Sequence, residues 1–189
     1  MTLSRNTLIL FLLLIAFGLS SWSIIITRQT SKVITQHSPD QPDAFMENIA
    51  STVFNKTGTP SLKVSAPKMV HYEENDVTEL TTPHVIVYRK SPEPWHIDAD
   101  YARATGGINQ ITFWNNVVIH HLADTQDPIT TMTTSSLTIV PDEKIAKTDD
   151  AVVMTQPDTT VHAVGMLANW EAGTVKLLSQ AREEYVPQS

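Results

Sequence analysis

Residues 129–156 read ITTMTTSSLTIVPDEKIAKTDDAVVMTQ, an alternating segment followed by a polar turn and a β-branched closing run. The turn is Pro141-Asp142-Glu143, and the closing run is Ala151-Val152-Val153-Met154. Alternation and β-branched residues are typical of strands, whereas Pro beside acidic residues is typical of turns. The stretch therefore predicts strands separated by a turn.

The same pattern recurs along the chain. Two further stretches, Ser61 to Tyr88 and Trp95 to Leu122, have the same length of 28 residues, and Thr160 to Tyr185 is a shorter fourth copy with Gly173 in its turn. Repetition at a fixed period indicates stacked units, each of which buries its apolar face against its neighbours. We therefore expect one continuous apolar interior. The closing runs of these copies are Val85-Ile86-Val87, Val117-Val118-Ile119 and Val175-Lys176-Leu177-Leu178.

An uncharged window of 19 residues, Leu8 to Ile26, lies near the N-terminus. About 20 apolar residues are enough to cross a bilayer as a helix. The alternative is a cleaved signal peptide, for which Ser20-Ser21 is a weak cleavage site. Apolar residues resume after Ser21, and the chain has no Cys for lipid attachment. We therefore expect an uncleaved transmembrane helix over residues 8–26.

The rest of the chain is acidic. Three of the 13 Lys and Arg precede Val33, whereas all 20 Asp and Glu follow it, so the remainder has a net charge of −10. Arg5 before the window and Arg28 and Lys32 after it nearly balance the positive-inside count. An acidic domain behind a short stub is readily translocated, so we place residues 1–7 in the cytoplasm and the domain outside it. The shortage of basic residues also argues against a nucleic-acid partner.

Composition divides the remaining chain into a tether, a domain and a tail. Residues 27–43 are rich in Ser, Gln, Thr, Asp and Pro, which is typical of a tether. Residues 44–186 form the domain, and residues 187–189 form a short tail. No segment after Lys32 has a 3.6-residue apolar period, so helices should be few. The sequence predicts an all-β domain.

Alternation assigns faces to the early strands of the domain. Phe45 to Val53 and the strand around Val64 are expected to form a hairpin through the turn Asn55-Lys56-Thr57-Gly58. Asp98 and Asp100 share a face, which a calcium site or an acid–base pair could use, but alternation favours a solvated outer surface. The residues expected on inner faces are Leu62, Val64, Ala66, Trp95, Ile97 and Ala99, and those expected on outer faces are Lys63, Ser65, His96, Asp98 and Asp100.

No catalytic or metal-binding constellation is visible in the sequence. No two of the seven His have the i, i+2 strand spacing or the i, i+4 helix spacing that would direct both at one metal. His120 and His121 are adjacent, so their side chains should point to opposite faces. Phosphate-binding glycine motifs, a nucleophile-elbow motif and Cys are also missing. We expect no catalytic residues, no metal, no cofactor and no enzymatic activity.

Six short motifs follow one another along the chain. Together with the N-terminal window, their order and spacing resemble the LptC family of lipopolysaccharide export proteins over nearly the whole chain, to about Tyr185. The motifs are Pro42-Asp43-Ala44-Phe45-Met46-Glu47-Asn48, Ala66-Pro67-Lys68-Met69-Val70-His71-Tyr72, Thr78-Glu79-Leu80-Thr81-Thr82-Pro83, Pro94-Trp95-His96-Ile97-Asp98-Ala99-Asp100, Asn116-Val117-Val118-Ile119 and Val164-Gly165-Met166.

The resemblance implies a Gram-negative inner-membrane protein with one transmembrane helix. Its periplasmic domain would be a twisted β-jellyroll, open along one side, whose apolar groove carries the acyl chains of lipopolysaccharide. The implied partners are the LptB/LptF/LptG ABC transporter, which supplies the lipid, and the bridge protein LptA, which carries it toward the outer membrane. Neither catalysis nor a cofactor is implied. Exposed strand edges would also permit a homodimer.

We expect apolar side chains to line the groove and the last strand to form the edge that meets LptA. Core packing is the alternative for each groove residue, because a register slip of one residue reverses the face. Gly165 is expected to permit a bulge or a close backbone approach. The groove residues are Ile49, Val64, Leu80, Ile97, Ile119, Met154, Val175 and Tyr185, and the partner edge comprises Val175, Leu177, Leu178 and Arg182.

Two hypotheses of different classes follow. In the first, the protein binds lipopolysaccharide and hands it from the transporter to LptA. In the second, the domain is solidly packed and is a scaffold that joins envelope proteins through its strand edges without binding lipid. An enzyme has no support, since no nucleophile, metal cluster or acid–base pair occupies an identifiable cleft.

Overall fold

The computed structural model describes residues 41–89, 92–125 and 127–185, which belong to the unit Pro39–Ser189. Within these ranges, no helix has the length and apolarity needed to cross a bilayer. Several predicted segments lie outside the described residues: the stub 1–7, the transmembrane helix 8–26, the tether as far as residue 40, and the tail 187–189.

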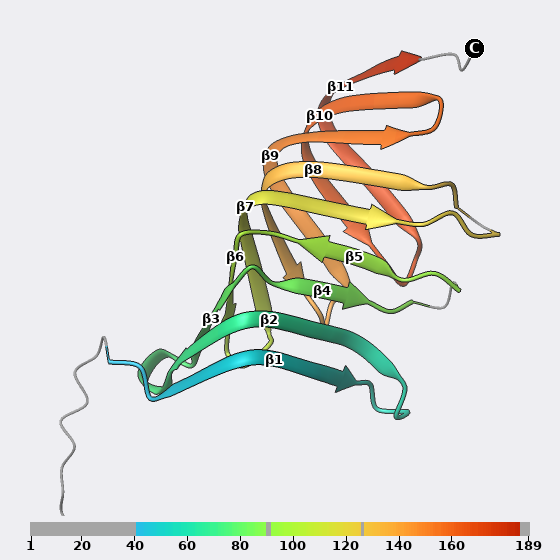
Figure 1. Ribbon diagram of the computed structural model, residues 1–189. Coiled ribbons are helices and arrows are strands. Elements are labelled where there is room, and N and C mark those ends of the chain that lie inside the picture. Colours follow the sequence, from blue (N-terminus) through green and yellow to red (C-terminus); the bar gives the residue numbers. More distant parts are fainter. Residues whose placement is uncertain (1–40, 90–91, 126, 186–189) are drawn as a thin grey trace, which may run out of the picture. The chain divides into compact units, whose positions relative to one another are not determined.

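Eleven antiparallel strands form a single sheet in the described part of the chain (Figure 1). The helical content there is limited to one 3-10 turn, η1 (Glu73–Asn75). Both observations confirm the all-β prediction. The strands are β1 (Ala44–Phe54), β2 (Pro60–Tyr72), β3 (Val77–Thr81), β4 (His84–Val87), β5 (Trp95–Asp98), β6 (Tyr101–Thr105), β7 (Gln110–His121), β8 (Thr130–Val140), β9 (Ile145–Gln156), β10 (Thr159–Asn169) and β11 (Thr174–Tyr185).

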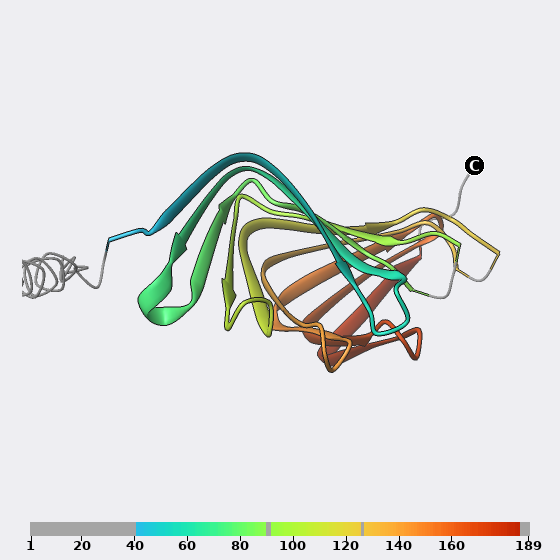
Figure 2. The same cartoon turned by 90° about the horizontal axis from the view of Figure 1, so that it is seen from below.

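A crease crosses the strands and divides the sheet into two limbs. On one side of the crease β2 pairs with β3 and β7 pairs with β6, whereas on the other side β2 pairs with β4 and β7 pairs with β5. Consequently β3 and β4 are two halves of one bent strand, and so are β6 and β5. We call the two sides the β3–β6 limb and the β4–β5 limb. Figure 2 shows the strands bending along this line.

Residues with positive φ lie along the crease. Thr82 (φ 48°) separates β3 from β4, Asn115 (61°) lies within β7, and Gln180 (52°) lies within β11. A left-handed backbone costs a non-glycine residue on the order of 1–3 kcal/mol. Hydrogen bonds along the crease offset this cost: the Thr82 amide donates to the Asp100 carbonyl at 2.7 Å, and the Asp100 amide donates to the Asn115 carbonyl at 3.0 Å.

A carboxylate reinforces the crease between β8 and β9. The side-chain oxygen of Asp150 accepts hydrogen bonds from Ser136 Oγ at 2.6 Å and Ser135 Oγ at 2.7 Å. These hydrogen bonds from Ser136 and Ser135 hold the pKa of Asp150 below its ordinary value. The charged form of Asp150 therefore stabilises the bend.

The bend of β10 at the crease lies at Gly165. Its φ is 78°, and the pairing of β10 with β9 shifts register between Val164 and Met166. A Cβ atom on Gly165 would lie 3.0 Å from Leu178 Cδ1 and 3.2 Å from Leu178 Cβ on β11. The predicted bulge at Gly165 is confirmed, and the close neighbour there is the side chain of Leu178.

Each predicted repeat is a hairpin of two bent strands. The copies are β2 with β3 and β4, β5 and β6 with β7, β8 with β9, and β10 with β11. Every bent strand pairs with the next one along the chain, so the spatial order of the strands follows the sequence. One apolar cluster spans all the copies, which confirms the predicted continuous interior.

The interior lies between the facing inner surfaces of the two limbs. Phe113 and Leu137 of the β3–β6 limb and Val85 of the β4–β5 limb have no exposed surface. Burying a side chain of this size stabilises the fold by about 1.5–3 kcal/mol. On the closing strand of the fourth copy, by contrast, Leu178 is 56% exposed. The predicted inner positions Leu62, Val64, Ala66, Ile97 and Ala99 are buried, as expected from alternation.

Candidate functional site

The part of the interior formed by the later strands is hollow. A cavity of about 290 Å³ lies there, open to the surface and lined mainly by apolar side chains. Three of the chain's six Met line it. Met side chains are flexible and polarisable, so they adapt to apolar ligands of variable shape. The principal apolar lining residues are Ile97, Ile119, Met132, Leu137, Ile139, Met154, Met166, Trp170 and Val175.

Strand register and side-chain size together produce the hollow. On the β4–β5 limb, cross-strand pairing aligns large residues into one inner row: Ile97, Ile119, Met132 and Met154. On the β3–β6 limb, pairing aligns Ile139 with Ala146, Ala146 with Ala168, and Ala168 with Val175. The small side chains of Ala146 and Ala168 leave room between the limbs. The cavity therefore arises because one limb carries small residues where the other carries long ones.

The cavity reaches the last strand, β11, which has no partner strand on its outer side among the described residues. Val175 of β11 lines the cavity and is 39% exposed. At the other end of the sheet, β1 is likewise unpaired on one side. Among the described residues, six of the ten exposed large hydrophobic side chains lie on these two edge strands: Phe45, Met46, Phe54, Val175, Leu178 and Tyr185. Apolar exposure is thus concentrated at the edges of the sheet.

A buried polar cluster borders the cavity. Arg89 and Asp127 line it, and the Arg89 side chain is only 7% exposed. Arg89 Nη2 lies 3.0 Å from His121 Nε2 and 3.6 Å from Asp124 Oδ2, and it also bonds to Asp127. The Trp95 ring packs against both His121 and the guanidinium, at 4.9 Å between ring centroids and 5.9 Å from Arg89 Cζ. We call these five residues the Arg89 cluster.

The Arg89 cluster resembles a metal site but already holds a cation. Potential ligand atoms of His121, Asp124 and Asp127 lie within 4.8 Å of one another. The guanidinium of Arg89 contacts all three groups, so the position a metal would take is occupied by the arginine. Removing one member of a buried ion-pair network leaves an uncompensated charge. The cluster therefore fastens the segment after β7 to the segment after β4 beside the cavity.

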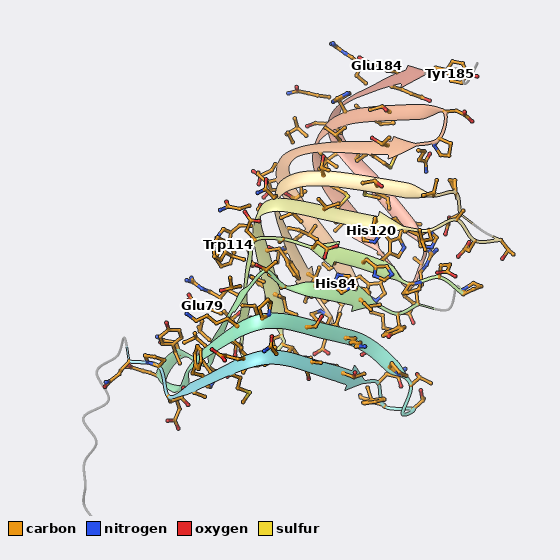
Figure 3. The ribbon with its side chains drawn as sticks, in the orientation of Figure 1. Glu79, His84, Trp114, His120, Glu184 and Tyr185 are labelled. Atoms are coloured by element: carbon orange, nitrogen blue, oxygen red, sulfur yellow. The ribbon has the colours of Figure 1, made fainter. Side chains whose placement is uncertain are left out.

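The structure distributes the predicted groove residues over the whole interior. Ile97, Ile119, Met154 and Val175 come together in the cavity. Val64 and Leu80 are buried farther along the same apolar cluster, and Ile49 packs against it. Tyr185 lies at the end of β11 and is 71% exposed (Figure 3). The predicted partner edge maps to the edge strand β11, at Val175, Leu177, Leu178 and Arg182.

Sequence reasoning missed several residues of the cavity. Met132, Met166 and Trp170 line it, as does Arg89. The occurrence of a single Met on each of three successive strands, β8, β9 and β10, was a signal for the first two. Nothing in the spacing of Arg89 indicated that it would be buried, because its three polar partners lie more than 30 residues away.

Comparison with known proteins is consistent with this architecture. The family model for lipopolysaccharide-assembly, LptC-related proteins matches residues 11–186. The fold is similar to the crystal structure of LptH, the LptA-homologous periplasmic component of the lipopolysaccharide transport device of Pseudomonas aeruginosa. The TM-score is 0.50 at 11% identity, over 68% of this chain and 95% of LptH. No curated protein sequence matches significantly. Because the family model covers nearly its whole length, the chain belongs to the LptC family.

Proposed function

We propose that this protein binds lipopolysaccharide and hands it from the LptB/LptF/LptG transporter to LptA, for assembly in the outer membrane. Membership of the LptC family supports a role in lipopolysaccharide transport. The main support for lipid binding is the apolar, methionine-rich cavity, which extends to the edge strand β11. The proposal assigns the protein no catalysis.

The physical problem is to keep acyl chains covered between two membranes. Each CH₂ group exposed to water costs about 0.8 kcal/mol, so a lipid with several chains needs an apolar path. The cavity volume of about 290 Å³ is at the lower end of the roughly 300–1,000 Å³ typical of ligand sites. The cavity would therefore hold only part of the acyl chains at a time, as expected of a protein that passes lipid along rather than enclosing a whole molecule.

The unpaired edges would be the points of exchange with partners. An exposed edge is a ready template for strand addition by another β protein. Under this proposal β11, beside the cavity, meets LptA, and β1 meets the periplasmic β domains of the transporter. A single-pass helix at residues 8–26 would hold the protein in the inner membrane with this domain in the periplasm.

Photocrosslinking in cells tests lipid binding directly. A photoreactive residue placed at Ile97, Met154 or Val175 should yield adducts that stain as lipopolysaccharide, whereas one placed at outward-facing Lys63 should not. Substitution Val175→Asp should lower the lipid adduct at Ile97 several-fold while the domain remains folded, because position 175 is partly exposed. Undiminished lipid adducts in a folded Val175→Asp variant, or equal labelling at Lys63, would contradict the proposal.

The scaffold hypothesis has its own support in the concentration of exposed apolar residues on β1 and β11. If the protein only joins partners, crosslinks from β11 should capture protein, and positions 97 and 154 should capture no lipid. Substitutions at these cavity positions would then matter only through stability. Lipid adducts at the cavity positions would exclude a purely structural role.

A further inference from the structure

Three histidines meet on the outer surface of the β4–β5 limb, on the side of β5 opposite to the cavity residue Ile97. His84 lies on β4, His96 on β5 and His120 on β7. Register pairs His96 with His120 and pairs His84 with Asp98, so the two pairs are diagonal neighbours. Figure 3 shows His84 and His120 projecting from the limb on neighbouring parts of the sheet. The spacing rule applied to the sequence considers one strand at a time and therefore could not find this cluster.

Two ring nitrogens of the cluster already have the spacing of metal ligands. His96 Nδ1 and His84 Nε2 are 3.4 Å apart. Two nitrogens bound tetrahedrally at 2.0–2.1 Å from zinc lie about 3.3–3.4 Å apart. A cation could therefore bind between these two nitrogens without a large movement of either ring.

Asp98 fixes the tautomer that such binding requires. Its Oδ1 lies 2.7 Å from His84 Nδ1. A carboxylate only accepts hydrogen bonds, so His84 Nδ1 carries a proton, and in the neutral ring the lone pair is on Nε2. The same carboxylate–histidine–metal arrangement orients ligand histidines in established zinc sites. Asp98 is therefore a positioning residue.

The second ligand ring, that of His96, is held in place by stacking. His120 stacks on His96 with ring centroids 4.8 Å apart and planes 7° apart. Burial, followed by the nearby His120 and His84, lowers the pKa of His96, while the charges of Asp98 and Glu93 oppose this shift. A neutral imidazole can tautomerise and offer Nδ1 to a cation. Metal binding would replace the present contact between the two rings.

We propose that His84 Nε2 and His96 Nδ1 form a surface site for a divalent transition metal of the zinc class, with Asp98 and His120 as positioning residues. Imidazole donors favour Zn²⁺, Cu²⁺ and Ni²⁺ over Mg²⁺ and Ca²⁺. The side chains of His84 and Asp98 are 39% and 44% exposed, so water can complete the coordination. This site does not depend on lipid binding. Unlike the Arg89 cluster, it contains no arginine between its ligand atoms.

Isothermal titration calorimetry of zinc into the purified full-length protein in detergent tests the site. We expect one Zn²⁺ per chain and loss of this binding in His84→Ala and in His96→Ala. Asp98→Asn should weaken it by about 10- to 100-fold, the usual effect of removing such a carboxylate. His162→Ala is the matched control, because His162 is an exposed histidine on β10 far from the cluster in sequence, and it should leave zinc binding unchanged.

Imidazole ¹⁵N NMR of the unmodified protein gives a readout that requires no variant to fold. Zinc should move the signals of His84 Nε2 and His96 Nδ1 and leave those of His162 in place. In Asp98→Asn, the His84 signals should also change without zinc, because the fixed tautomer is lost. The proposal is overturned if the unmodified protein binds no zinc, or if folded His84→Ala and His96→Ala variants still bind it. Zinc lost instead in Asp127→Asn would place the ion in the Arg89 cluster.

Discussion

The early and late parts of the sheet use the same hairpin repeat but fill it differently. Around β6 and the part of β7 as far as Val117 the interior is solid, and Ala102, Phe113 and Val117 have no exposed surface. Around β9 to β11 the interior is hollow, because Ala146 and Ala168 face long, flexible side chains across the cavity. The difference shows that side-chain volume at a few inner positions, rather than backbone topology, determines whether the interior of a repeat is filled or contains a cavity.

The largest loss of stability is expected from truncating a buried side chain in the solid part of the interior. Phe113→Ala should lower the free energy of unfolding by about 3–5 kcal/mol, because it removes a fully buried ring and leaves a cavity. Urea denaturation measures this loss. A change below about 1 kcal/mol would show that the early part is not tightly packed and would remove the contrast with the late part.

A matched pair of substitutions, each replacing an inner Ala by the larger Leu, compares the two parts of the sheet directly. Ala102→Leu should cost about 1–3 kcal/mol, since Ala102 is fully buried in a filled region. Ala168→Leu points into existing space and should change stability by less than about 1 kcal/mol. It should nevertheless reduce lipid crosslinking at Met154 several-fold by filling the cavity.

Equal destabilisation by the two leucines would contradict the contrast between the solid and hollow parts. Undiminished crosslinking in the Ala168→Leu variant would indicate that lipid takes another path.

An effect similar in size to that of Ala102→Leu is expected at the crease of the late part. Gly165→Ala should destabilise by about 1–3 kcal/mol, because the residue has positive φ and the new Cβ would press on Leu178. Gly107→Ala is the control: it shares a positive φ of 67° but has open space around it, so it reports backbone strain alone. Thermal unfolding of both variants separates the two contributions. Equal shifts in Tm would mean that the contact with Leu178 is irrelevant.

The smallest effect is expected at Asp150, which joins the solid part to the hollow one at the crease between β8 and β9. Its lowered pKa means that its stabilising effect is present above its ordinary pKa of 3.8 and disappears as pH falls through the lower folded value. Because Asp150 is only partly buried, Asp150→Asn should lower Tm by only about 1 °C at pH 7. The two Tm values should converge as the pH is lowered below 3.8, and a difference that grows on acidification would reverse the assigned sign.

Much of the fold followed from local patterns, whereas the sites depended on register. Alternation placed Leu62, Val64 and Ile97 correctly, because the period of two is a property of a single strand. The crease could not be predicted, because Thr and Gln, which stand at positions 82 and 180, rarely adopt the left-handed backbone conformation found there. The hollow requires knowledge of which residues face one another across the interior.

The histidine cluster shows the same limit more sharply. His84, His96 and His120 are separated by 12 and 24 residues in the sequence. They meet only because two particular registers, that of β4 with β5 and that of β5 with β7, align them. Until strand pairing is known, each remains an isolated polar residue on an outer face.

The agreement between chain order and strand order affects how the domain can form. Each bent strand pairs with the strand that precedes it in the chain. The edge of the growing sheet is therefore always the strand that was added last. Contacts of this kind close short loops and keep the relative contact order lower than in sandwiches that pair distant strands. The sheet can therefore lengthen strand by strand in chain order, with β11 as the last strand to be added.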